Sequence, residues 1–150
     1  MTTTHVTKPD LTTRPFHLSC DRCMRAAPQR LYCAWTEQLD HWFATPGTVL
    51  LRPELNAPYF FETLYQGTRH PHYGRILRLE PHHRIDMTWV TTATHGAETV
   101  LVLEFEPSAL GTHLRLTHSG FDDEASMHRH EIAWPRVLER LDTKIGADAA

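Results

Sequence analysis

The sequence predicts an α+β fold in which a long C-terminal helix packs against a curved antiparallel sheet of about six to seven strands. Two observations near the end of the chain support this prediction. Residues 97–118 contain two segments of alternating apolar and polar residues, joined by a turn at 107–111, and such alternation is typical of half-buried strands. From Asp122 onwards the apolar residues recur every three or four positions, which indicates a helix with one face to bury.

Each of these C-terminal elements has a defined apolar face. The first strand places Thr99, Leu101, Leu103 and Phe105 on one side, and the second places Leu114, Leu116 and His118 together. Asp122 or Asp123 is a suitable helix cap. Pro135 removes a backbone donor, so we expect a kink or break near Glu131–Pro135. The stripe of the helix comprises Met127, Glu131, Trp134, Leu138, Leu141 and Ile145.

The first half of the chain contributes the remaining elements. Phe16–Met24 alternates as a strand, and Ala27-Pro28 opens a helix because proline suits the first helical turn. A second short helix is expected from Thr36 through Phe43, before Thr45-Pro46-Gly47 ends it. Four more strands are predicted at Val49–Arg52, Tyr59–Gln66, Tyr73–Glu80 and Arg84–Thr91.

Length and composition indicate one ordinary globular domain. With 150 residues, 41% hydrophobic and 22% charged, the chain is expected to fold as a single domain over residues 14–145, with flexible tails at 1–13 and 146–150. A net charge of −3 gives no basic footprint for nucleic acid. The sequence shows neither a membrane-spanning apolar run nor an export signal, so we expect a cytoplasmic protein.

Several short segments carry a resemblance to a known family. In order along the chain they are Ala27–Thr36, Leu39–Phe43, Gly74–Pro81, Asp86–Trp89, Gly111–Gly120 and the helix around Trp134. Over roughly residues 16–145 the chain resembles the Hsp90-ATPase-activator-homologue-1-like family of the START/Bet v 1-like, helix-grip superfamily. The resemblance implies a cavity between helix and sheet that mostly binds apolar ligands, although some members of the superfamily are cyclases or other enzymes.

The chain also departs from the family pattern. Glu54–Pro58 lacks the Gly-Gly pair that often precedes the second long strand, and Ala133 replaces the glycine that commonly precedes the helix tryptophan. The eukaryotic co-chaperones carry a separate N-terminal domain, for which this chain has no room. We therefore expect Hsp90 activation to transfer poorly.

Cysteines and histidines suggest two further sites, and we expect neither to form. Cys20 and Cys23 are three apart in a predicted strand, so they point to opposite faces and remain unrelated thiols, and Cys33 lies on a helix face. The pairs His70/His72, His82/His83 and His128/His130 lack the spacing of a zinc constellation. We therefore expect no metal and no cofactor.

Eight side chains are candidates for binding a ligand in the predicted cavity. Arg75, His118 and Glu131 would supply a cation, an imidazole and a carboxylate, which could orient a ligand or perform acid–base chemistry. Each also has an ordinary structural explanation, and the aromatic candidates are more often core than site. The full set is Trp42, Phe61, Tyr65, Arg75, Trp89, His118, Glu131 and Trp134.

Three functions remain open from the sequence. The first is a non-enzymatic binding domain for a small apolar or amphipathic molecule. The second is a cyclase- or hydrolase-like enzyme, which requires Arg75, His118 and Glu131 to converge in one pocket. The third is a protein-interaction module, such as a chaperone partner, with an exposed apolar patch and a filled interior. A homodimer is compatible with each of them.

Overall fold

The computed structural model describes residues 6–146, so the outer parts of the two expected tails, 1–5 and 147–150, lie outside the described residues. Residues 6–13 contain no helix or strand, whereas Gly146 is the last residue of the final helix. Along the chain the elements are β1 (Phe16–Met24), α1 (Pro28–Thr36), η1 (Leu39–His41), β2 (Pro58–Tyr65), β3 (Thr68–Glu80), β4 (Arg84–Trp89), η2 (Thr92–Thr94), β5 (Thr99–Ser108), β6 (Gly111–Phe121) and α2 (Glu124–Gly146).

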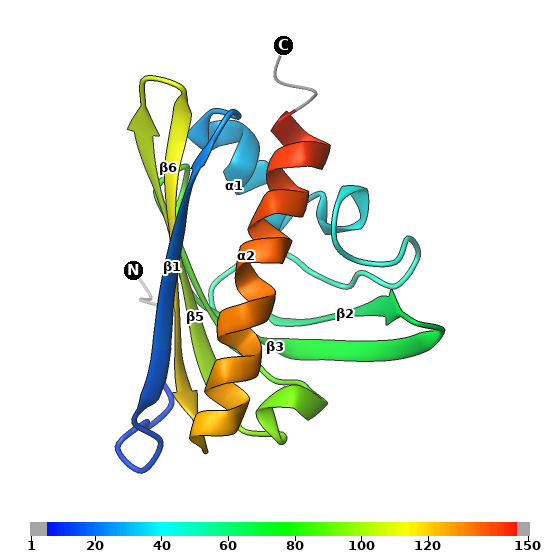
Figure 1. Ribbon diagram of the computed structural model, residues 1–150, viewed down its shortest axis with the longest axis vertical. Coiled ribbons are helices and arrows are strands. Elements are labelled where there is room, and N and C mark those ends of the chain that lie inside the picture. The colour runs from blue at the N-terminus through cyan, green and yellow to red at the C-terminus, as the bar shows by residue number, and fades with distance from the viewer. Residues whose placement is uncertain (1–5, 147–150) are drawn as a thin grey trace, which may run out of the picture.

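The strands form one antiparallel sheet of six strands in the order β1-β6-β5-β4-β3-β2. The register between β3 and β4 shifts between Ile76 and Arg78, and such a bulge bends the strand and increases its twist. Figure 1 shows the result: β2 and β3 extend as an arm across the direction of β1, β5 and β6. The α+β fold with a curved antiparallel sheet is as the sequence predicts.

The core lies between α2 and the face of the sheet that the alternating residues present. Leu101, Leu103 and Phe105 of β5 are buried, as are Leu114 and Leu116 of β6, so the predicted faces of both strands are confirmed. Full burial of each such side chain stabilises the fold by about 2 kcal/mol. The buried stripe of α2 comprises Ser126, His130, Trp134, Leu138, Leu141, Asp142 and Ile145.

The long helix begins and ends close to where the sequence predicts, but it lacks the break that we expected within it. Asp123 caps it, because its Oδ1 accepts a hydrogen bond from the backbone N–H of Ser126 at 2.7 Å. The helix is continuous through Pro135, so no break occurs near Glu131–Pro135. Both Glu131 and Pro135 are exposed, and water can satisfy the carbonyl that proline leaves without a donor.

Two predicted elements of the first half differ in the structure. The strand expected at Val49–Arg52 is a single bridge in which Leu50 exchanges two backbone hydrogen bonds with Phe60, at 2.7 and 2.8 Å. In this register the next hydrogen-bonded pair would be Arg52 with Pro58, and Pro58 has no N–H to donate. The second short helix is one 3₁₀ turn, η1, after which the backbone N–H groups of Phe43 and Ala44 both donate to Leu39 O, at 2.9 and 2.8 Å, so the helix does not continue.

The cysteines lie as the strand assignment of Phe16–Met24 requires. Cys20 is half-buried and Cys23 is exposed, and they point to opposite faces of β1. All three cysteines are free thiols. No helix within residues 6–146 combines the length and the apolar character that crossing a membrane requires.

Candidate ligand-binding cleft

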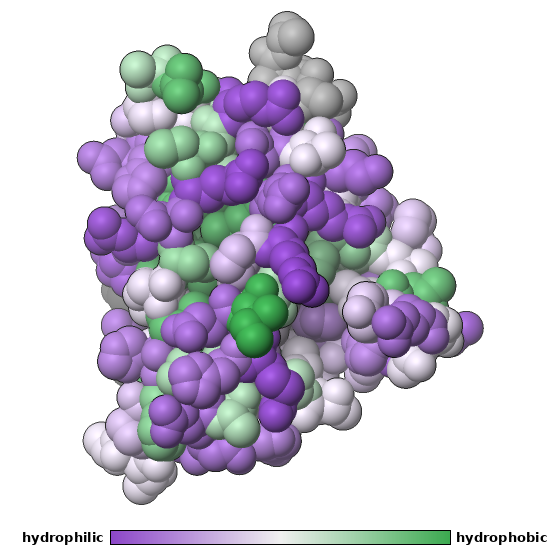
Figure 2. Space-filling view, viewed as in Figure 1, coloured by the Kyte–Doolittle hydropathy of each residue, from purple (hydrophilic) through white to green (hydrophobic). Residues whose placement is uncertain are grey.

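A cleft of about 960 Å³ opens between α2 and the β2–β3 arm. Figure 2 shows it as a hollow to the right of α2, with hydrophilic side chains along the helix edge. Thr63, Leu64 and Tyr65 of β2 form one wall, α2 forms the opposite wall, and the turn at Thr91–Ala93 closes one end. The cleft exists because the arm diverges from the rest of the sheet while α2 stays on the core.

The floor of the cleft is aromatic. Trp89 of β4 and Trp134 of α2 lie side by side with ring centroids 5.2 Å apart. Phe43 stacks parallel to Trp89 at 6.3 Å, and the edge of His72 meets Trp89 at 5.1 Å. Beneath them Phe61, which is fully buried, stacks on His72 at 4.7 Å. The base of the cleft is therefore aromatic, and its rings are packed against one another so closely that Trp89 and Trp134 are each only 3% exposed.

His118 connects the two tryptophans from behind the floor. Trp134 donates its Nε1–H to His118 Nδ1 at 3.0 Å, and His118 Nε2 lies 2.7 Å from Thr99 Oγ1. An indole N–H only donates, so Nδ1 must accept and the imidazole proton must be on Nε2. Thr99 Oγ1 in turn donates to the backbone carbonyl of Trp89. This chain of hydrogen bonds links the indole of Trp134 to the backbone of Trp89.

The buried histidines are neutral at pH 7. Burial lowers the pKa of His118 well below its usual value, and repulsion from His130 lowers it further. Burial is also the main cause that lowers the pKa of His72 to about 4 and that lowers the pKa of His130. His72 Nδ1 donates to His70 O at 2.9 Å and His130 Nδ1 donates to Ser126 O at 2.8 Å, so these rings carry their protons on Nδ1.

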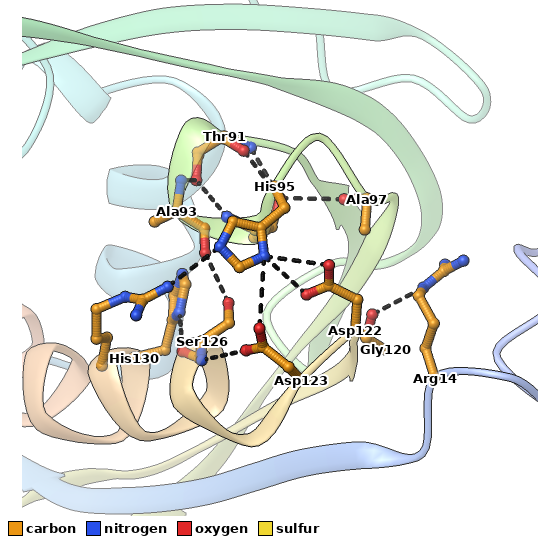
Figure 3. A network of polar contacts seen from close by, with 12 residues as sticks. Arg14, Thr91, Ala93, His95, Ala97, Gly120, Asp122, Asp123, Ser126 and His130 are labelled. Carbon is orange, nitrogen blue, oxygen red and sulfur yellow. Dashed lines mark hydrogen bonds and ion pairs between the residues drawn. The ribbon is translucent and has the colours of Figure 1, made fainter.

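A polar network fixes the closed end of the cleft against the start of α2 (Figure 3). Ser126 Oγ donates to the carbonyl of Ala93 at 2.6 Å, and Thr91 and Thr94 form a reciprocal capping box around η2. His95 Nδ1 lies 3.0 Å from Asp122 Oδ1 and 4.0 Å from Asp123 Oδ2. These contacts join the η2 turn to the start of α2.

His95, Asp122 and Asp123 form the one group within residues 6–146 whose ligand atoms are close enough to share a metal ion. All three are exposed, and Arg129 Nη2 lies 3.3 Å from the other ring nitrogen of His95. A guanidinium there opposes a second cation, so an ion pair explains the arrangement. The three histidine pairs of the sequence do not form a metal group among the described residues.

The eight predicted ligand-binding residues are not all in the cleft. Tyr65, Trp89 and Trp134 line it. Phe61 lies under the floor, and Trp42 is buried in the core with its Nε1–H donated to Ala34 O at 2.9 Å. His118 is behind the floor rather than on it.

Arg75, His118 and Glu131 do not converge, and none of the three lines the cleft. Arg75 pairs with Glu98 at 3.3 Å. Glu131 is exposed and lies 3.3 Å from His128 Nδ1, because the buried stripe of α2 passes through His130 and Trp134 instead. The arrangement that acid–base catalysis by these residues requires is therefore absent.

Several cleft residues were not among the sequence-based candidates. Phe43, His72 and His130 belong to the aromatic lining, and four cations of α2 line the cleft as well. A signal for the cations was present, because Arg136, Arg140 and Lys144 follow one another at helical spacing beside Trp134. His72 and His130 appeared in the sequence only as members of local histidine pairs.

A long C-terminal helix held by a curved sheet, with a cleft between helix and sheet arm, defines a helix-grip domain. The family model described as Activator of Hsp90 ATPase homolog 1-like protein matches residues 25–146. The chain belongs to this family. No curated protein matches the chain.

Solved structures show the same fold at low sequence identity. A crystal structure of a protein from Chromobacterium violaceum is 24% identical, with a TM-score of 0.75 over 88% of this chain and 99% of that one. The AHSA1-like protein from Aeromonas hydrophila is 16% identical, with a TM-score of 0.68 over 89% and 94%. The Aha1 dimer from Colwellia psychrerythraea is 16% identical, with a TM-score of 0.65 over 87% and 96%.

Proposed function

We propose that this protein binds a small apolar or amphipathic molecule in the cleft between α2 and the β2–β3 arm, without catalysing a reaction on it. The observation that carries the proposal is the aromatic floor, in which hydrogen bonds through His118 link the indole of Trp134 to the backbone of Trp89. A cleft of about 960 Å³ is within the range of small-molecule sites, which are mostly apolar and largely preformed.

The two alternatives have less support. An enzyme that uses Arg75, His118 and Glu131 needs them in one pocket, and they have separate partners. A chaperone-linked interaction module predicts a filled interior, which the cleft does not favour. A cytoplasmic location belongs to our proposal, and the three free thiols support it because they persist in a reducing compartment.

A homodimer is a separate proposal, supported by the dimer described for the Colwellia protein. Light scattering during gel filtration, at several protein concentrations, tests it. A mass of one chain at every concentration would contradict it.

A screen of apolar and amphipathic compounds by thermal unfolding tests ligand binding. A compound that binds only the native state and is present at a hundred times its Kd stabilises the protein by about 3 kcal/mol, so we expect a clear rise in Tm. Ala133→Trp places a bulky ring in the cleft and should abolish that rise. Ala125→Trp makes the same substitution on the same helix outside the cleft and should preserve it.

The outcome that would contradict the proposal is a broad screen without any shift in Tm. A shift of equal size in the Ala133→Trp and Ala125→Trp variants would also contradict it, because the ligand would then bind elsewhere.

A further inference from the structure

The helical wall of the cleft is strongly cationic. Arg129, Arg136, Arg140 and Lys144 all line the cleft and all are exposed, whereas Glu139 is the one carboxylate in the lining. These four cations occur on one side of α2, seven and then four and four residues apart, so they lie above one another along the helix. The opposite wall, at Thr63–Tyr65, carries no charge.

This charge is the reverse of that of the whole chain, which has 18 acidic and 15 basic residues and a net charge of −3. Composition therefore does not account for four cations in one cleft. The helix dipole favours cations in the last turn of α2, which explains Lys144. It does not explain Arg129 and Arg136, which lie well before the last turn.

Two of these cations have no partner within the described part of the chain. Arg136 and Lys144 make no hydrogen bond or ion pair there, and Glu139 lies beside them without pairing. Arg140 uses only its Nε, which donates to Trp42 O at 2.6 Å, and its two terminal amino groups remain free to donate. Arg129 is engaged through Nη2 with His95. Charged donors are thus available along the wall.

We infer that the molecule bound in this cleft is an anionic amphiphile, whose aromatic or acyl body lies on the Trp89–Trp134 floor and whose carboxylate, sulfonate or phosphate group faces Arg136, Arg140 and Lys144. This inference rests on the proposed function. Hydrogen bonds from charged donors to an oxyanion are stronger than neutral ones, and a cleft lined by one sign of charge attracts the opposite sign. A cationic or neutral ligand of the same shape gains neither contribution.

A pair of fluorescent probes tests separately whether the cleft binds an apolar body and whether it prefers an anionic group. Anilinonaphthalene sulfonate is an anion, and N-phenylnaphthylamine has the same two aromatic groups without the sulfonate. We expect the full chain to bind both probes, the anion at least fivefold more tightly, which corresponds to about 1 kcal/mol. Raising the salt concentration should weaken binding of the anion and leave the neutral probe unaffected.

The charge contribution is located by the double substitution Arg136→Gln with Lys144→Gln. Because neither side chain has a partner within residues 6–146, the fold should be unaffected, and a thermal unfolding curve checks this. We expect the anionic probe to bind about fivefold more weakly and the neutral probe to bind as before. The matched control is Arg52→Gln with Arg115→Gln, which removes two exposed cations outside the cleft.

The results distinguish failure of the inference from failure of the proposed function. If both probes bind with equal affinity, or if the control variant weakens the anion as much as the cleft variant does, the anionic ligand class is wrong while the cleft remains a binding site. If neither probe binds, or if Ala133→Trp leaves the binding of both unchanged, the proposed function fails as well.

Discussion

At the scale of the residue, buried His118 joins Trp134 to Thr99 by two hydrogen bonds. Its side chain is fully buried, accepts a hydrogen bond from Trp134 and donates one to Thr99. A buried donor or acceptor that loses its partner costs about 1–3 kcal/mol. The imidazole thus supports the floor of the cleft without lining the cleft itself.

His118→Phe should lower the free energy of unfolding by about 2 kcal/mol, because it leaves the indole N–H of Trp134 and the hydroxyl of Thr99 without this partner. In the double variant with Trp134→Phe the unpaired indole donor is gone, so the loss should be smaller than the sum of the single losses by about 1 kcal/mol. Urea unfolding of the four proteins of this cycle measures the difference. Strictly additive losses would show that the two side chains are not coupled.

At the scale of the element, α2 is attached to the sheet by one carboxylate as well as by its apolar stripe. Asp142 accepts hydrogen bonds from the backbone N–H of Arg25 at 3.0 Å and from Arg22 Nη2 at 3.2 Å. Burial alone would raise the pKa of Asp142, but these hydrogen bonds and the charge of Arg25 together lower it. The C-terminal half of α2, which carries Arg136, Arg140 and Lys144, is thereby attached to the end of β1.

Asp142→Asn should destabilise the protein by about 1–2 kcal/mol, since the amide loses the charge-assisted hydrogen bonds to both arginines. Glu139→Gln, three residues earlier and without a hydrogen-bond or ion-pair partner in the described part of the chain, is the control and should change stability by less than about 0.5 kcal/mol. Denaturant unfolding of both variants provides the comparison. Equal stability of the two would show that the Asp142 contacts are not needed to hold α2.

At the scale of the whole molecule, three buried neutral histidines make stability depend on pH. His72, His118 and His130 all have a pKa below that of an exposed imidazole, mainly because of burial. They occur on β3, β6 and α2. His118 contacts His130 with ring centroids 5.1 Å apart, and His72 and His118 both contact Trp89. Protonating any of them places a charge in this apolar region.

The free energy of unfolding should therefore fall as the pH decreases from about 6.5 to 4. In this range the three imidazoles bind protons in the unfolded chain but remain neutral in the folded chain. For His72 the pKa falls from 6.5 to about 4, which corresponds to about 3 kcal/mol lost across that window. Above pH 6.5 both states are neutral and the contribution vanishes. Urea unfolding at a series of pH values measures the slope.

His72→Phe keeps a stacking ring and removes one titrating group, so the variant should show a shallower decrease between pH 6.5 and 4, whatever its stability at pH 7. An unchanged slope in the variant would contradict the assignment to His72. A flat profile in the parent protein would contradict the neutral state of all three imidazoles.

The sequence by itself determined the elements and their buried faces. Alternation along 99–105 and 114–118 required two half-buried strands, and the helical period from Asp122 required a helix with an apolar stripe. The cysteines of β1 follow from the same rule, because residues three apart on a strand point to opposite faces. Where a single backbone bridge forms, as at Leu50, local pattern did not distinguish it from a strand.

Only the tertiary structure decided which side chains form the cleft. The spacing of apolar residues shows which face of a strand or helix a side chain lies on, but not which element packs against that face. The sequence therefore places Arg75 and Glu131 in the cavity, whereas in the structure they pair with Glu98 and His128. The cationic wall depends on where the β2–β3 arm diverges from α2. The arm begins near the shift in register between Ile76 and Arg78, and such a shift depends on pairing with a neighbouring strand, which the local sequence pattern does not specify.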